Sequence, residues 1–132
     1  MLDRLNLFWF SPVMASRAPR PLKVRFFRTL SGREPAREWL QEFSTEDKKI
    51  IGTDIKTVQW GWPLGKPLID SLGEGLWEIR CTLSDRIARV FFFIQDEQIV
   101  ILHGIIKKTQ TTPAQDLKLA RKRQSLCVPP TE

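Results

Sequence analysis

The residue types best suited to phosphate chemistry in this chain are basic, and they recur on three consecutive apolar segments of its second half. Guanidinium and ammonium groups stabilise anionic phosphate oxygens, and imidazole exchanges a proton near neutral pH. Several cations on one open sheet repel each other unless an anion lies among them, so the pattern favours a polyanion. The alternative is that Glu78, Asp85 and solvent neutralise these charges. The candidate residues are Arg80, Arg89, His103 and Lys107, with Arg86 and Lys108 at the margins.

The three apolar segments predict antiparallel strands, because they are rich in β-branched and aromatic residues and are separated by short polar turns. Successive side chains of a strand point to opposite faces of the sheet. We therefore expect Glu78 and Arg80 on one face and Trp77 on the other. The predicted strands are Leu76–Leu83, Ile87–Ile94 and Gln98–Ile106.

The first half of the chain predicts two helices between two further strands. Pro35 suits the first position of a short helix, and Ser44 or Thr45 suits the cap of a longer one. The flanking strands are expected at Leu22–Thr29 and Lys66–Leu72. The apolar residues of the longer helix recur at helical spacing, at Ile51, Ile55, Val58 and Trp62.

A last helix is predicted after Pro113, where Thr112 and Gln115 form a capping-box pattern, and it is expected to end near Gln124. Gly104 lies inside a predicted strand and indicates a bulge or a close backbone approach. The order of elements predicts an α+β fold. We expect a small, antiparallel-rich twisted sheet with two N-terminal helices and one C-terminal helix, all on one side of the sheet.

Composition indicates one folded domain. The chain has 132 residues, a formal net charge of +6 and 42% hydrophobic residues, and no apolar run approaches the roughly 18 residues that cross a bilayer. Two distant cysteines exclude a disulfide framework and a cysteine zinc cluster, and a single histidine argues against a histidine metal site. We expect a disordered or loosely docked extension over residues 1–21, a domain over 22–124 and a flexible tail over 125–132.

Three motifs, in their order and spacing, resemble the phage-derived HigB-type toxins of the RelE/ParE superfamily. The resemblance covers residues 22–124 and implies a RelE/ParE-like fold. It further implies a type II toxin: a cytoplasmic, ribosome-dependent mRNA endonuclease that uses no metal or cofactor and is silenced by a helix-turn-helix antitoxin of the HigA type. The motifs are Gly75–Arg80, Arg86–Phe93, and His103–Thr109 with Pro113.

The resemblance also implies a site. Arg80 and Arg89 match basic residues of two core strands, and Lys107 or Lys108 matches the basic residue that ends the last strand. Cleavage by attack of the RNA 2′-hydroxyl on the adjacent phosphate requires a proton acceptor and stabilisation of charge. His103, one of the two lysines and Glu78 are all candidates for moving the proton, and the choice stays open. Further RNA contacts are expected from Trp77, Arg86, Arg121, Lys122 and Arg123.

The chain contains no tyrosine, whereas related toxins often carry one near the active face. Trp77 is the candidate for stacking a base in its place. Two alternatives to the nuclease are kept open. One is a gyrase-poisoning toxin of the ParE type, against which the dense basic cluster argues. The other is a catalytically inert protein that only binds an antitoxin.

Overall fold

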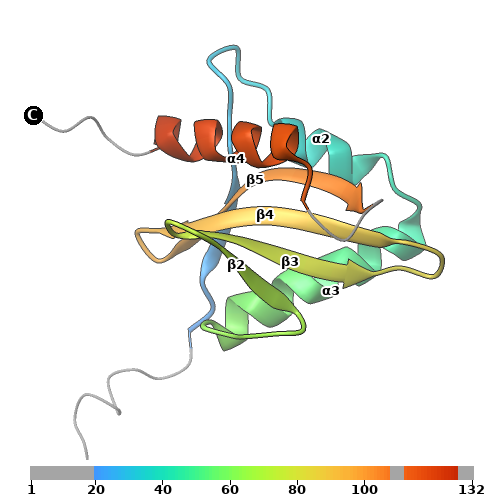
Figure 1. The fold of residues 1–132 in the computed structure, drawn as a ribbon. Helices are drawn as coiled ribbons and strands as arrows, with labels where there is room; N and C mark the ends of the chain where they lie inside the picture. The colour runs from blue at the N-terminus through green and yellow to red at the C-terminus, as the bar shows by residue number, and fades with distance from the viewer. Residues whose placement is uncertain (1–19, 108–111, 128–132) are drawn as a thin grey trace, which may run out of the picture.

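The computed structural model describes residues 20–107 and 112–127, which form a five-stranded sheet and three helices (Figure 1). The strands lie in the order β1-β5-β4-β3-β2. No helix in these two ranges is long and apolar enough to span a membrane. The elements are β1 (Lys23–Phe26), α2 (Pro35–Gln41), α3 (Thr45–Gly61), β2 (Ile69–Gly73), β3 (Leu76–Thr82), β4 (Ile87–Gln95), β5 (Gln98–Lys107) and α4 (Ala114–Cys127).

The sheet is mixed. Strands β2 to β5 pair antiparallel with their neighbours, whereas β1 pairs in parallel with β5 and forms one edge. The α+β class and all five predicted strands are confirmed. The strand ends differ by a few residues, most at two of them: the first strand is expected to reach Thr29 but ends at Phe26, and the second is expected from Lys66 but begins at Ile69.

The two N-terminal helices begin where the sequence predicts. Pro35 opens α2, and the Ser44 hydroxyl accepts a hydrogen bond from the backbone N–H of Asp47 at 3.1 Å, which caps α3. The apolar side of α3 buries Ile51 and Val58 against the sheet. This face of the sheet carries the larger of the two apolar cores.

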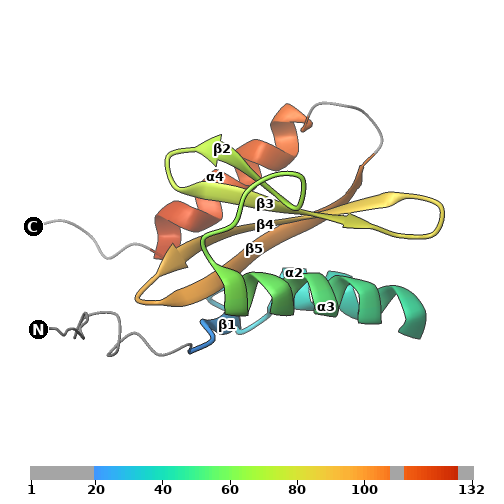
Figure 2. The same ribbon diagram turned by 90° about the horizontal axis from the view of Figure 1, so that it is seen from below.

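The expectation that all helices lie on one side of the sheet is wrong. Helices α2 and α3 cover one face, and α4 covers the other (Figure 2). The cause lies in β4, where Phe91 and Phe93 are buried on the α4 side while Val90 and Phe92 are buried on the α3 side. A strand that is apolar on both faces needs cover on both.

The C-terminal helix is longer than expected. It runs to Cys127 rather than ending near Gln124, so residues 125–127 of the predicted tail are helical. The side-chain amide of Gln95 donates a hydrogen bond to the Cys127 carbonyl at 2.9 Å and ties this last turn to the sheet. Residues 128–132 of the predicted tail and residues 1–19 of the predicted N-terminal extension lie outside the described residues.

A β-bulge in β5 determines which way His103 points. Phe91 pairs with His103 and Phe92 pairs with Ile101, so Leu102 has no partner on β4. Simple alternation from Ile101 would place His103 on the α3 face, but the extra residue sends Leu102 and His103 together to the α4 face. The close approach expected at Gly104 is also confirmed. This glycine follows the bulge directly, and the ring of Trp39 packs on it.

Candidate functional site

The basic residues predicted on three strands share the sheet face that α4 partly covers. The register pairs Arg80 with Arg89 across β3 and β4. It pairs Phe91 with His103 and Ile87 with Lys107 across β4 and β5. Odd-numbered residues of β4 face α4, so all four candidate residues lie on this face. They are Arg80, Arg89, His103 and Lys107.

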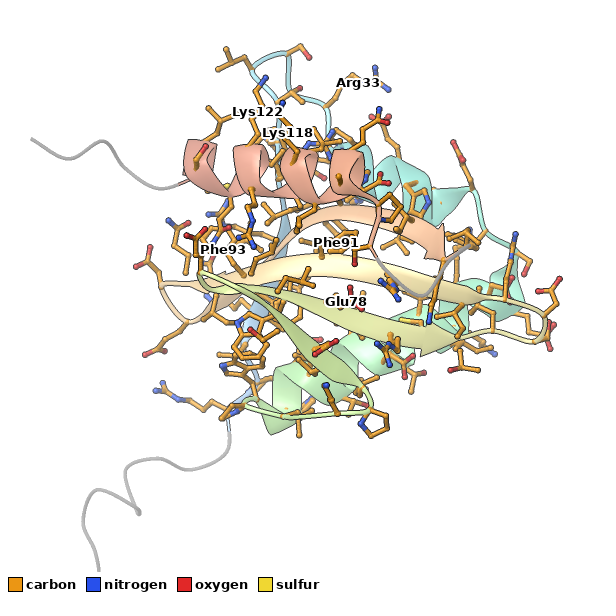
Figure 3. All side chains as sticks on the ribbon, in the orientation of Figure 1. Arg33, Glu78, Phe91, Phe93, Lys118 and Lys122 are labelled. Carbon is orange, nitrogen blue, oxygen red and sulfur yellow. The ribbon has the colours of Figure 1, made fainter. Side chains whose placement is uncertain are left out.

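A buried carboxylate lies at the centre of this face. Glu78 is 1% exposed and stands opposite Phe91 in the register (Figure 3). Both of its oxygens contact Arg89, with Nη1 at 3.5 Å from Oε1 and Nε at 3.5 Å from Oε2. Arg89 itself is only 2% exposed. The two side chains therefore form an ion pair almost entirely out of water.

Thr112 completes this pair from the segment before α4. Its hydroxyl accepts a hydrogen bond from Arg89 Nη1 at 2.7 Å and donates one to Glu78 Oε1 at 3.3 Å. The predicted capping-box role of Thr112 is thus replaced by a contact with the sheet. The arrangement connects the start of α4 to the centre of the basic face.

Arg80 lies at the accessible margin of the cluster around Glu78, which we define as Glu78, Arg89, Thr112, Arg80 and Asp70. Its Nη2 is 3.6 Å from Oδ2 of Asp70, and its Nε is 3.9 Å from Glu78 Oε2. Lys66 Nζ lies 3.7 Å from the other oxygen of Asp70. The Arg80 side chain is 34% exposed, so it reaches solvent while it is held by two carboxylates.

The sequence predicts an open cationic face, but in the structure Glu78 and Asp70 compensate the charges of Arg80 and Arg89. Arg89 is buried against Glu78, so in this arrangement its guanidinium group is directed to the carboxylate and not to solvent. Glu78 is likewise held by two arginines and lies out of water. The sequence analysis missed Asp70 and gave Thr112 only a capping role. The register of β2 brings Asp70 here, and the hydrogen bond from Arg89 brings Thr112.

His103 is held by a carboxylate of α4. Its Nε2 lies 2.8 Å from Oδ1 of Asp116, and its ring stacks on Phe91 with centroids 5.7 Å apart and planes 14° from parallel. The contact at Nε2 leaves Nδ1 as the ring nitrogen without a hydrogen bond to another described residue. Lys107 ends β5, is half-buried, and makes no ion pair within the described part of the chain. Lys108 lies outside the described residues.

Two predicted RNA contacts lie on the opposite face. Trp77 packs edge-on against Trp62 at 5.0 Å on the α3 side, which makes it part of the core there. Arg86 lies 3.5 Å from a carboxylate oxygen of Asp47 and above the ring of Phe43 at 5.5 Å. Neither is brought together with the cluster around Glu78. Trp77 alternates to the other side of β3, and Arg86, in the turn before β4, is directed to Asp47 of α3.

The basic run of α4 mostly attaches the helix to the sheet. Arg121 donates a hydrogen bond to the Gly73 carbonyl at 3.1 Å. Arg123 donates one to the Leu102 carbonyl at 2.8 Å and lies over the Phe27 ring, and burial lowers its pKa. Lys122 is exposed on the outer side of the helix (Figure 3). Of the three, only Lys122 is free of such an attachment and accessible to a polyanion.

The described residues also bear on other site chemistries. They contain no group of three or more His, Cys, Asp or Glu side chains placed to hold a metal ion. Cys81 is fully buried, and burial, with Asp54 nearby, raises the pKa of its thiol well above the usual range. Such a thiol is a poor nucleophile.

Comparison with known proteins gives the family. The model of the phage-derived Gp49-like proteins (DUF891) matches residues 38–125. The chain belongs to this family. Gp49-like proteins are a RelE/HigB-like toxin family, and the matched range includes β2 to β5, nearly all of α4 and therefore every residue of the cluster around Glu78. A search of curated proteins finds no match to the chain.

Proposed function

We propose that this chain is the toxin of a type II toxin–antitoxin pair and that it cleaves messenger RNA on the ribosome. The observation that carries the proposal is the gathering of Arg80, His103 and Lys107 on one sheet face, around the buried pair of Glu78 and Arg89. Membership of the Gp49-like family supports the toxin role. The resemblance of the motifs to HigB-type toxins supports the choice of mRNA.

The proposed reaction uses the 2′-hydroxyl of the RNA as nucleophile. Its oxygen bonds to the adjacent phosphorus while the bond from phosphorus to the 5′-oxygen breaks, which leaves a 2′,3′-cyclic phosphate and a 5′-hydroxyl. One proton leaves the attacking hydroxyl and one is delivered to the departing oxygen. The protein must therefore supply groups that move protons and cations that stabilise the doubly negative phosphorane.

The accessible residues of the face divide these roles. Arg80, at the solvent margin, can exchange its contact with Asp70 for a phosphate oxygen, and its planar fork suits two oxygens at once. His103 and Lys107 are the candidates for moving protons. Arg89 acts indirectly, because it fixes Glu78 and Thr112 beneath the phosphate.

The proposed partners follow from the proposed role as an mRNA-cleaving toxin. The ribosome would present the mRNA strand in the cytoplasm and add positioning and charge to a modest protein site. A helix-turn-helix antitoxin of the HigA type would silence the toxin. Lys122 would offer ribosomal RNA a contact outside the cluster.

Induced expression in bacteria tests this function. Wild-type protein should arrest growth and give new 5′ ends inside translated mRNA by primer extension. Lys107→Ala should reduce the cuts at least about tenfold. Lys56→Ala, an exposed lysine on α3, serves as the matched control and should cut like the wild type. Growth arrest without new RNA ends, or full cutting by Lys107→Ala, would contradict the proposal, and gyrase-linked DNA breaks would favour the ParE-type alternative.

One observation favours a second candidate function. Glu78 and Asp70 already compensate the two arginines that the motif assigns to phosphate. A protein that retains the fold and only binds an antitoxin would have that property. Harmless expression of a folded protein that still captures a helix-turn-helix partner would support this candidate over the nuclease.

A further inference from the structure

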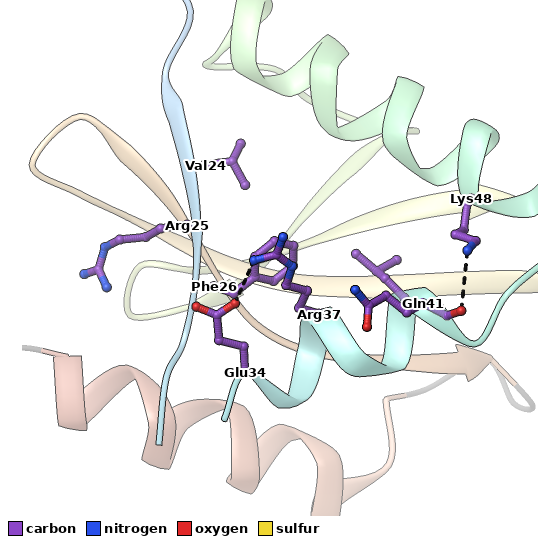
Figure 4. Close-up of a pocket in the computed structure, with 8 residues that line it drawn as sticks. Val24, Arg25, Phe26, Glu34, Arg37, Gln41 and Lys48 are labelled. Atoms are coloured by element: carbon purple, nitrogen blue, oxygen red, sulfur yellow. Dashed lines mark hydrogen bonds and ion pairs between the residues drawn. The ribbon is translucent and has the colours of Figure 1, made fainter. Parts of the chain in front are cut away.

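A groove of about 440 Å³ opens at the β1 edge of the sheet, between this strand and helices α2 and α3 (Figure 4). Val24, Phe26 and Leu40 supply its apolar wall. It lies at the opposite edge of the sheet from β2 and Asp70, so it is separate from the cluster around Glu78. Its polar lining residues are Arg25, Glu34, Arg37, Gln41 and Lys48.

The outer edge of β1 presents unpaired backbone groups to this groove. The N–H of Phe27 donates to the Ile101 carbonyl at 2.8 Å, so odd-numbered residues of this strand face β5. The N–H and C=O groups of Val24 and Phe26 therefore point away from the sheet, and neither residue has an outward partner among the described residues. At Leu22 the same edge is already closed, because Gln59 of α3 takes both backbone groups.

The charge around this edge is positive. Arg25 donates hydrogen bonds to the neutral amides of Gln95 and Gln98, and Lys48 donates to the Gln41 carbonyl, so neither cation pairs with a carboxylate of residues 20–107 or 112–127. Glu34 is the one carboxylate in the lining. It is shared by Arg37 and Arg28 at 3.2 Å each, and their hydrogen bonds lower its pKa.

We propose that this edge binds an extended acidic segment of a partner protein, which adds to the sheet as a sixth strand beside β1. The alternating outward donors and acceptors of Val24 and Phe26 match a polypeptide backbone. The phosphate oxygens of a nucleic acid backbone accept hydrogen bonds but donate none to the outward carbonyls, and the 2′-hydroxyl donors of RNA do not alternate with acceptors at the spacing of a strand. The edge therefore favours a peptide over RNA.

The cations lie on both sides of such a strand. Side chains of the added strand that face α3 would meet Arg37 and Lys48 beside the apolar wall. Those on the other side would meet Lys23 and Arg25, which alternate to the opposite face of β1. Acidic residues are therefore accommodated in either register, and apolar residues are accommodated beside Val24 and Phe26.

A binding measurement with the full chain tests the proposal. The probe is a fluorescent, end-blocked peptide of alternating glutamate and valine, about eight residues long, which matches the length of the edge with its flanks. We expect saturable binding that weakens as salt rises from about 50 to about 300 mM. Lys48→Glu should weaken binding about tenfold, whereas Lys56→Glu, on the same helix outside the groove, should leave it unchanged within about twofold.

The role of the strand edge is tested by changing the backbone of the probe. The same peptide with N-methylated valines keeps its charge but loses donors, and it should bind at least about tenfold more weakly. Hydrogen exchange at the amides of Val24 and Phe26 should be fast in the free protein and slow with the peptide bound.

Four results would overturn the proposal. Equal binding of the methylated peptide would reduce the interaction to charge attraction. Equal binding by Lys48→Glu would place the peptide elsewhere. Slow exchange at Val24 and Phe26 without peptide would mean that another segment of the chain already occupies the edge. Displacement of the peptide by a uridine oligonucleotide would also count against it, since RNA would then be the preferred occupant.

Discussion

At the scale of single residues, charge compensation around Glu78 governs the candidate site. One carboxylate contacts two guanidinium groups, and Asp70 holds the more exposed of these, on Arg80, from the far side. Removal of one partner from a buried ion pair costs more than the pair itself contributes, because the remaining charge stays out of water. The buried contact of Arg89 with Glu78 therefore contributes to the stability of the fold, whereas the partly exposed side chain of Arg80 can exchange its contacts for a ligand.

We predict that Glu78→Gln destabilises the protein by about 3 kcal/mol, since it leaves Arg89 buried beside a neutral amide. Glu74→Gln is the control, because Glu74 makes a similar contact with Arg121 at 3.5 Å but is 84% exposed. That change should cost less than about 1 kcal/mol. Urea denaturation measures both free energies of unfolding. Equal losses in the two variants would contradict the claim that Glu78 and Arg89 form a buried ion pair.

Asp70→Asn should strengthen the binding of RNA. The change releases Arg80 from its competing carboxylate, so affinity for a ribosome-bound mRNA should rise by up to about fivefold, the equivalent of one partly exposed ion pair. The salt dependence of binding should also become steeper. Filter binding across a salt series measures both, and an unchanged or lower affinity would argue that Arg80 does not meet the RNA.

At the scale of elements, the bulge in β5 and the glycine after it set the orientation of the site. Leu102 and His103 both turn to the α4 side, and Gly104 then faces α2, where only a hydrogen leaves room for Trp39. Asp116, in the first turn of α4, meets His103 because of this shift. The position of the histidine therefore depends on a local irregularity of one strand.

Gly104→Ala should destabilise the protein by roughly 1 to 3 kcal/mol, because the added methyl overlaps the Trp39 ring. Gly52→Ala is the matched glycine control. It lies on the exposed side of α3, where a methyl group meets nothing within 4 Å, and it should stabilise by about 0.5 to 1 kcal/mol. Thermal unfolding that shifts in the same direction for both variants would contradict the proposed packing of Trp39.

At the scale of the whole molecule, local signals in the sequence predict the elements, and long-range contacts decide the site. The cap at Ser44, the proline at Pro35 and the strand alternation at Arg80 are local, and the structure follows them. The side of the sheet taken by α4 follows from Phe91 and Phe93, whose burial opposite Phe92 shows only in the assembled sheet. The pairing of Asp70 with Arg80 needs the register of two strands, which no local pattern contains.

The buried thiol of Cys81 reports on the cooperativity of this assembly. It is fully buried on the α3 side of β3, and burial raises its pKa. In a Cys127→Ser variant, we predict that Cys81 reacts with a thiol reagent only as fast as the whole protein unfolds, with the same dependence on denaturant. Rapid labelling in native buffer would show that β3 opens locally.

The nuclease activity is best tested by incubating purified protein with programmed ribosomes and measuring cleavage of the bound mRNA. We expect cuts in the ribosome-bound mRNA by wild-type protein, a rate about a hundredfold lower for Arg80→Ala, and an unchanged rate for Lys56→Ala. A folded wild-type protein that leaves the mRNA intact, or an Arg80→Ala variant that cuts as fast as wild type, would contradict it.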